Sequence, residues 1–351
     1  MYIREATADD NNELRELQAK CPQGKTLIVS TINTPDFFAR AKAYESYKVY
    51  VACIEDHIIG SGTCVVRNAI VNGQLDRVGY LFQLFVNPEY RRKGVARELF
   101  RYREDYLTQK GAALAYALIM ENNIPSMRYV ESQGFKLNRK LVMPALAIYK
   151  KMDVASRGNI RPIAKEDLDA VAKLMNDTWQ GYELYEPISA EGLAVFIHRI
   201  PAYILDNLLV LENKGEILAC LGFWDWRKIM RITVIESSLK MRITSSILNL
   251  VGRFRPMPRG VSPGDTLNQI MLTPIAFKEL EHLTTLLRYL NNEALSSGIN
   301  QIFFICESGH RLLKCMKGFI SIKTGVNLYV KSLKPHIWIG DKPIFVDGID
   351  M

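Results

Sequence analysis

Three consecutive cations, Arg91-Arg92-Lys93, stand where a helix is expected to begin. The apolar run Tyr80–Val86 before them is typical of a strand, and an amphipathic run at helical spacing follows them. Because a helix N-terminus carries a partial positive charge, cations there are unfavourable unless the terminus receives an anion. Free backbone N–H groups and the small residues Gly94 and Ala96 suit a pyrophosphate. The pattern therefore predicts a phosphate-binding loop, with a solvated basic turn as the alternative for such a motif taken alone.

A second strand and a short helix follow this loop. The apolar run Ala113–Met120 is typical of a strand. Asn123 and Pro125 are helix-start signals, and Gly134 is a helix-stop signal. Residues 80–135 are thus predicted to form a strand, a basic glycine loop, a helix, a strand and a short helix.

In order and spacing, these elements strongly resemble the Gcn5-related N-acetyltransferase (GNAT) superfamily over about residues 1–150. The acetyl-CoA motif of that family, R/Q-x-x-G-x-G/A, is matched by Arg91, Gly94 and Ala96. Its later motif, an Asn followed by a short helix that ends in Gly-Phe, is matched by Asn123, Ser126, Gly134 and Phe135. The resemblance implies an α/β fold with a mixed central sheet flanked by helices. It also implies direct transfer of an acetyl group from acetyl-CoA to an amine.

The resemblance assigns most of the cofactor site to the main chain. The backbone of Leu84, Phe85 and Val86 would pair with pantetheine like an added strand, and an N–H group there would face the thioester oxygen. The pyrophosphate would be held by the N–H groups of the loop and helix start: Arg92, Lys93, Gly94, Val95, Ala96 and Arg97. The motif residues Arg91, Asn123 and Ser126 complete the expected cofactor-binding set.

The expected catalytic side chains depart from the family pattern. Many members have a glutamate four residues before the valine that Val86 matches, but here that position is Phe82. The neighbouring Gln83 could orient a water molecule. Many members also place a tyrosine, as general acid, seven residues after the asparagine, whereas Tyr129 is one position away, a turn of about 100° on a helix. Gln83 and Tyr129 are therefore the catalytic candidates, and a thiol with a pKa of about 8.5 can also leave unaided.

The second half of the chain restarts like the first. The segment Ile3–Asp10 is similar to Ile160–Asp167, and Cys315–Phe319 is similar to the end of the short helix at Gly134. We therefore predict two tandem GNAT-like domains, residues 1–152, which bind acetyl-CoA, and residues 153–351. The second domain is expected to shape the acceptor site.

The second copy is predicted to have lost the phosphate loop. A strand is expected at Thr266–Leu272, and the segment Thr273–Leu280 after it has no glycine and carries an acidic residue. Backbone without glycine cannot approach a pyrophosphate as closely. This copy also carries an insertion at about 231–263 with the basic stretch Arg253–Arg259, interpreted either as a covering loop or as a substrate element.

The composition of the chain argues against several other functional classes and partners. The 351 residues carry a net charge of +8, and the basic residues are spread out, with no recognised nucleic-acid motif. No apolar run approaches the roughly 20 residues that span a bilayer, so a membrane partner is not expected. The six cysteines are scattered, without C-x-x-C pairs, so neither a metal site nor a disulfide framework is expected. The polar, acidic start is unlike a signal peptide, which indicates a cytoplasmic protein.

These observations favour an acetyl-CoA-dependent N-acetyltransferase that acts on a primary amine of a small molecule, peptide or protein. One alternative is a CoA-binding sensor or scaffold without catalysis, suggested by the missing glutamate and tyrosine. Another is an amino-acyl transferase that uses tRNA, suggested by the tandem architecture and the basic charge. The intact phosphate loop of the first copy disfavours this last hypothesis.

Overall fold

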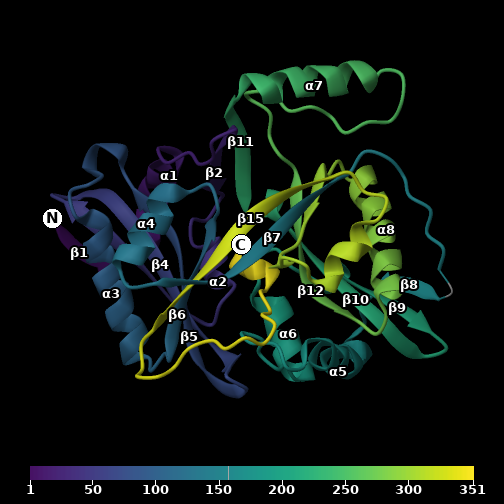
Figure 1. The fold of residues 1–351 in the computed structure, drawn as a ribbon, viewed down its shortest axis with the longest axis horizontal. Coiled ribbons are helices and arrows are strands. Elements are labelled where there is room, and N and C mark those ends of the chain that lie inside the picture. Colours follow the sequence, from purple (N-terminus) through teal and green to yellow (C-terminus); the bar gives the residue numbers. More distant parts are fainter. Residues whose placement is uncertain (157) are drawn as a thin grey trace.

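A single mixed sheet of 13 strands runs through the molecule, in a computed structural model that describes residues 1–156 and 158–351 (Figure 1). The strand order is β1-β3-β4-β5-β6-β15-β7-β13-β12-β10-β9-β8, with β14 paired to β7 beside this path. Helices flank the sheet, which confirms the predicted α/β class. The first half of the chain supplies β1 (Tyr2–Glu5), α1 (Asn11–Ala19), β2 (Leu27–Asn33), α2 (Ala39–Lys42), β3 (Ser46–Ile54), β4 (His57–Val71), β5 (Gln74–Val86), α3 (Val95–Gln109), β6 (Leu114–Met120), α4 (Ile124–Ser132) and β7 (Lys136–Ala147).

The second half follows a similar order, without a counterpart of β2, with a 3-10 helix (Arg311–Met316) at the place of α4, and with one large addition. It supplies β8 (Asn159–Pro162), α5 (Leu168–Trp179), α6 (Ala190–Arg199), β9 (Leu208–Asn213), β10 (Glu216–Asp225), β11 (Met230–Ser237), α7 (Leu239–Val251), β12 (Gln269–Phe277), α8 (Leu280–Ser296), β13 (Gln301–Phe303), β14 (Cys306–Glu307) and β15 (Ser321–Ser332). The addition is β11 and α7, and β11 pairs with β2 in a separate two-stranded sheet. In each half a parallel strand pair is joined by a helix, β5-α3-β6 or β12-α8-β13.

The repeat extends to an irregularity in the central strand of each half. The pairing of β4 with β5 shifts register at Gly62, and the pairing of β10 with β12 shifts register at Gly222. In each case two residues bulge out opposite one glycine, Gln83-Leu84 in the first half and Thr273-Pro274 in the second. A bulge re-aims the backbone and interrupts pairing, and such bulges occur next to active sites.

The two halves exchange strands at the centre of the sheet. β15 lies between β6 and β7, antiparallel to both, with Tyr329 opposite Ala117 of β6 and Leu137 of β7. β7, from the first half of the sequence, pairs in turn with β13 of the second half. Two central strands therefore join halves that are far apart in the sequence.

One predicted strand boundary is wrong. The strand expected at Thr266–Leu272 instead runs from Gln269 to Phe277 and includes Pro274. Proline is tolerated in a sheet at a bulge, because no ladder N–H is needed there. The loop of the second half that corresponds to the predicted phosphate loop is therefore only Lys278-Glu279, directly before α8.

Candidate functional site

Gly94 shapes the predicted phosphate loop. It has φ 84°, in the left-handed region, and it forms the N-cap of α3. A side chain of any other residue is strained in this conformation. A Cβ atom built on Gly94 would meet no described atom within 4 Å, so the backbone here is open to an approaching group. The glycine therefore supplies both the turn and the space that a bound pyrophosphate requires.

The first turn of α3 offers N–H donors to this space. The first backbone bond of the helix joins the Glu98 N–H group to the Gly94 carbonyl oxygen at 3.1 Å. The N–H groups of Val95, Ala96 and Arg97 precede it, and such groups have no partner within their own helix. Together with the partial positive charge of the helix end, they form an anion-binding surface.

The cations of the loop differ in what they contact. Arg91 folds back, since its Nε donates to the Val86 carbonyl oxygen at 3.2 Å and so connects the loop to the end of β5. The Lys93 ammonium lies 5.0 Å from the centre of the Tyr90 ring. Arg91, Arg92 and Lys93 are all exposed at this face. The loop is thus fixed at one end and carries positive charge at its surface.

The strands that precede and follow α3 in the sequence, β5 and β6, diverge. β5 and β6 pair only over Val78–Tyr80 and Leu114–Tyr116, and beyond these residues the described strands no longer pair. Leu84, Phe85 and Val86 lie on the diverging part of β5, where Phe85 and Val86 pair on the other side with β4. Apart from the Val86 carbonyl oxygen, which accepts from Arg91, their edge toward β6 has no strand partner among the described residues and could pair with an extended ligand.

Gln83 is placed at the bulge of this open edge. It has φ 49° and its side chain is buried. Its Oε1 accepts a hydrogen bond from the Thr63 hydroxyl at 3.1 Å, whereas its Nε2 has no partner in the described chain. The buried hydroxyl of Ser61, on the facing strand, also lacks a partner among the described residues. Unpaired buried polar groups cost about 1–3 kcal/mol each, so this pair points to a polar ligand or water at the bulge.

The hydroxyl group of Tyr129 is already hydrogen-bonded within the protein. Its hydroxyl donates to the Ala96 carbonyl oxygen at 2.6 Å, which fastens α4 to the first turn of α3. Burial raises the pKa of Tyr129, while the nearby Arg103 opposes that shift. A phenol whose proton is already donated to a backbone carbonyl is a poor source of a proton for a leaving thiolate. The geometry thus favours a packing role for this residue over the general acid expected from the sequence.

Asn123 and Ser126 form the start of α4. The Asn123 Oδ1 accepts from the Ser126 N–H group at 3.3 Å, which is the helix cap that the sequence indicates. The Nδ2 of Asn123 and the Ser126 hydroxyl are left for any cofactor contact. Their expected role in cofactor binding remains a prediction.

A buried polar cluster that the sequence did not indicate lies where β5 and β6 separate. Tyr80 and Tyr116 are the last paired residues of the two strands, and their rings stack with centroids 4.9 Å apart. The Asp350 carboxylate accepts from Tyr116 at 3.0 Å and from Tyr44 at 2.6 Å, and Arg67 lies 3.7 Å from it. Burial raises the pKa of Tyr116 well above its ordinary value. The cluster fixes the C-terminal segment against the opening.

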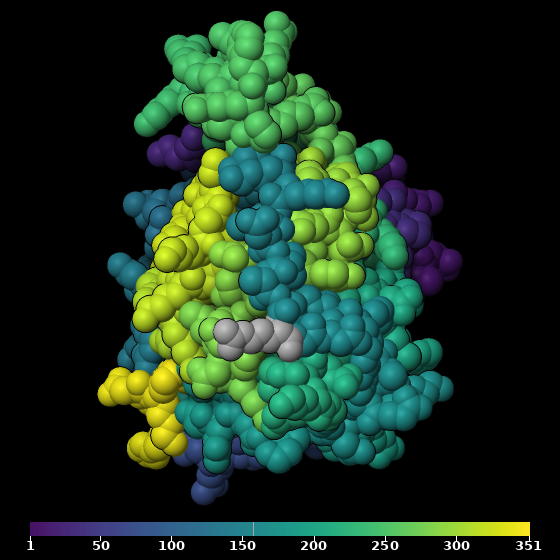
Figure 2. Space-filling view, turned by 90° about the vertical axis from the view of Figure 1, so that its right-hand side faces the viewer, coloured from purple at the N-terminus to yellow at the C-terminus, as the bar shows by residue number. Residues whose placement is uncertain are grey.

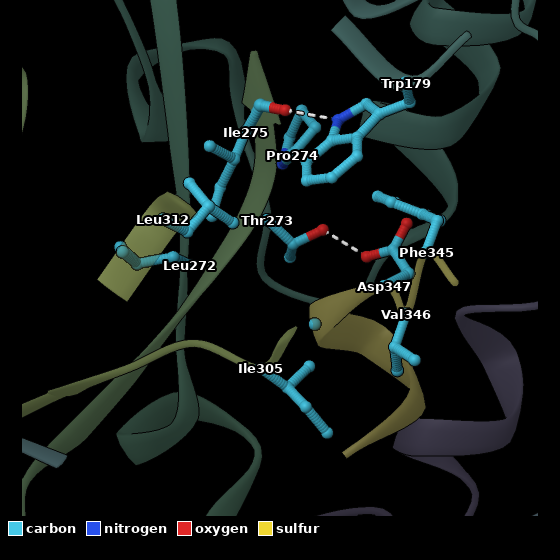
Figure 3. A pocket seen from close by; sticks show the side chains of 11 residues that line it. Trp179, Leu272, Thr273, Pro274, Ile275, Ile305, Leu312, Phe345, Val346 and Asp347 are labelled. Atoms are coloured by element: carbon cyan, nitrogen blue, oxygen red, sulfur yellow. Dashed lines mark hydrogen bonds between the residues drawn. The ribbon is translucent and has the colours of Figure 1, made fainter. Parts of the chain in front are cut away.

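The corresponding opening of the second half is closed. β12 and β13 pair in parallel over only three residues each, as β5 and β6 do. Figure 3 shows the C-terminal segment here, with Asp347 bonded to Thr273 at the bulge and Phe345 beside Trp179. The cavity that remains has a volume of about 20 Å³. That volume holds about one water molecule and no cofactor.

Nothing in the described structure indicates a metal site, since no three His, Cys, Asp or Glu side chains lie together there as a set of ligands.

Comparison with known proteins agrees with this geometry. Residues 11–135 match the sequence model described as "Acetyltransferase (GNAT) family". No curated protein sequence matches the chain.

Among solved structures, Saccharomyces cerevisiae N-myristoyltransferase with bound myristoyl-CoA is similar at a TM-score of 0.65 and 12% identity, over 94% of this chain and 77% of that one. A GCN5-related N-acetyltransferase from Sphaerobacter thermophilus is similar at a TM-score of 0.58 and 12% identity, over 96% of both chains. A probable N-acyltransferase from Enterococcus faecalis V583 has a TM-score of 0.52 and 10% identity, over 95% of this chain and 72% of that one. At these identities the likeness shows the fold.

Proposed function

Since residues 11–135 match the model of the acetyltransferase (GNAT) family, we propose that the chain is an N-acyltransferase that uses acetyl-CoA as its donor. The observation that carries the proposal is the combination of two features along β5 and α3. One is the open, cationic helix start at Gly94, and the other is the free strand edge at Leu84–Val86. A CoA thioester needs both, because its pyrophosphate is an anion and its pantetheine arm is an extended chain of amides.

The chemistry required of the chain is modest. Bound acetyl-CoA would supply a thioester carbon for the amine nitrogen to attack, so that a C–N bond forms, the C–S bond breaks, and CoA leaves as a thiolate that takes its proton from solvent. Backbone N–H groups at the bulge of Gln83 and Leu84 would stabilise the charge that develops on the carbonyl oxygen. The unpaired Nε2 of Gln83 and hydroxyl of Ser61 would hold a water molecule that removes the amine proton. An amide is not itself a base, so this role is one of orientation.

The acceptor would enter from the side of the second half. The C-terminal segment, held by Asp350 against Tyr116 and Tyr44, lies at the separation of β5 and β6. We therefore propose that residues from 153 onward shape the acceptor site, as the sequence suggests. The acceptor would be an amine of a small molecule, a peptide or a protein.

Turnover tests the proposal directly. The full chain is incubated with acetyl-CoA and a library of amines and peptides, and released thiol and acylated products are measured by absorbance and mass spectrometry. A parallel series of longer acyl-CoA donors tests chain length, because the yeast structure similar in fold holds myristoyl-CoA. Acyl transfer that disappears in a variant of the Gly94 loop supports the proposal. Tight CoA binding without turnover of any donor would instead favour a CoA sensor.

A further inference from the structure

A helical arm, residues 238–264, rises from the body of the protein. Figures 1 and 2 show α7 standing apart above the rest of the surface. The arm is attached through β11, which pairs with β2, and it returns where the Val234 N–H group bonds to the Asp265 carbonyl at 2.9 Å. Within α7 itself Ser245 is the one buried residue. The helix therefore presents most of its circumference to its surroundings.

One side of this helix is an exposed apolar stripe. It consists of Leu239, Ile243, Ile247 and Leu250, which are 71%, 53%, 56% and 57% exposed, with Phe254 at 85% just beyond the helix end. The spacing of four, four and three residues places the four members within the helix in an arc of about 80°. Single exposed apolar residues are ordinary, but an aligned row of this kind marks an interaction surface.

Positive charge borders the stripe. Lys240 and Arg242 lie on either side of it, about 100° and 300° round the helix from Leu239. Arg253, Arg255 and Arg259 follow in the return segment, and all five cations are exposed. The arm contains no Asp or Glu, so apart from the 3.5 Å approach of Arg259 to Asp265 beyond its end, its charge is uncompensated locally.

We propose that the α7 arm docks on the surface of an anionic lipid bilayer. An amphipathic helix with Leu, Ile and Phe on one face and Lys and Arg beside them lies in the plane of such a surface, with its apolar face among the upper acyl chains. The flanking cations can extend to the phosphates while their stems stay apolar. At 13 residues the helix is about 20 Å long, too short to cross a bilayer.

The positive charge of the arm favours an anionic bilayer over other partners that could cover the apolar stripe. A second copy of the chain meeting the stripe face to face would bring five cations against five, which repel. A nucleic acid would account for the cations but not for a row of aliphatic side chains. An anionic lipid surface complements both features. The sequence-based expectation of no membrane partner considered only segments that could span a bilayer. None of the described helices has the length and apolar character to do so. A helix that binds in the plane of the membrane surface needs no spanning segment.

Vesicle flotation of the full chain tests the proposal. The wild type should float with vesicles of phosphatidylglycerol and phosphatidylcholine in equal parts, but not with pure phosphatidylcholine, and added salt should weaken binding. Ile243→Asp/Ile247→Asp should weaken vesicle binding at least about a hundredfold, since two apolar anchors become anions. Val195→Asp is the matched control, because Val195 is 51% exposed on α6, outside the arm.

A second pair of variants does not alter the helix. Arg253→Gln/Arg255→Gln should weaken binding about 25-fold, at about fivefold for each cation near an anionic surface. Lys165→Gln/Lys214→Gln removes the same charge far from the arm and should bind like the wild type. The proposal is overturned if the wild type ignores anionic vesicles, or if the aspartate pair floats as well as the wild type. It is equally overturned if light scattering shows a dimer that the aspartate pair dissociates, or if the arginine pair loses tRNA binding while vesicle binding is unchanged.

Discussion

At the scale of the residue, Gly94 is the most sensitive position of the proposed donor site. Gly94→Glu should abolish CoA binding, because it places a carboxylate beside the pyrophosphate and strains a left-handed backbone. Isothermal calorimetry with CoA measures the effect. The strain alone costs about 1 kcal/mol of stability, so the variant should remain folded.

Gly111→Glu is the control for position. Gly111 also has a positive φ, 75°, with open space around it, but it lies at the other end of α3. This variant bears the same strain and charge away from the loop and should bind CoA like the wild type. Unaltered CoA affinity in Gly94→Glu would remove the phosphate site from this loop.

Tyr129→Phe should reduce kcat less than about tenfold, because its hydroxyl bonds to the Ala96 carbonyl and not to a free site. The lost hydrogen bond should lower stability by about 1 kcal/mol. Tyr106→Phe is the control, since its hydroxyl also has one partner, the Ser46 hydroxyl at 2.8 Å. A loss in kcat above about a hundredfold, at unchanged KM and only for Tyr129, would make it the general acid.

At the scale of the element, the position of β15 couples the two halves. It separates β6 from β7, and its removal would leave both with unpaired edges in the middle of the sheet. A fragment that ends near Ala155 lacks this strand. We therefore propose that the two predicted domains fold as one cooperative unit, although their sequences divide near residue 152.

Tryptophan fluorescence tests this coupling, because all four tryptophans, at 179, 224, 226 and 338, lie in the second half. Leu99→Ala removes a fully buried side chain of α3 in the first half and should destabilise the fold by about 2–5 kcal/mol. The denaturant midpoint measured by tryptophan fluorescence should fall in Leu99→Ala as far as it falls in Leu286→Ala, which removes a buried side chain of α8. A midpoint unmoved by Leu99→Ala would show that the halves unfold separately.

At the scale of the whole molecule, we expect one acyl-CoA per chain. The second half connects β12 to α8 through Lys278-Glu279, with Glu279 and Glu281 at the helix start, where negative charge disfavours a pyrophosphate. Its strand opening is filled by the C-terminal segment around Asp347. Calorimetry should give one CoA site, and Gly94→Glu should remove it. A second site, or binding that survives in that variant, would contradict this division between the halves.

The sequence by itself determined the local features of this protein. The cations, Gly94 and the start of α4 at Asn123 could be predicted because helix caps and glycine turns depend on neighbouring residues. The repeat was visible for the same reason, since each copy restarts with similar local signals. The α/β class followed from the order of strands and helices.

The tertiary structure alone decided what joins distant segments. No local signal places β15 between β6 and β7, because strand exchange depends on pairing across about 200 residues. No local signal brings Asp350 to Tyr116, 234 positions away, or lets Pro274 continue a strand whose bulge is set by the facing Gly222. The exposed stripe of α7 was equally hidden, because an apolar row at helical spacing is ordinarily buried and only packing shows whether another element covers it.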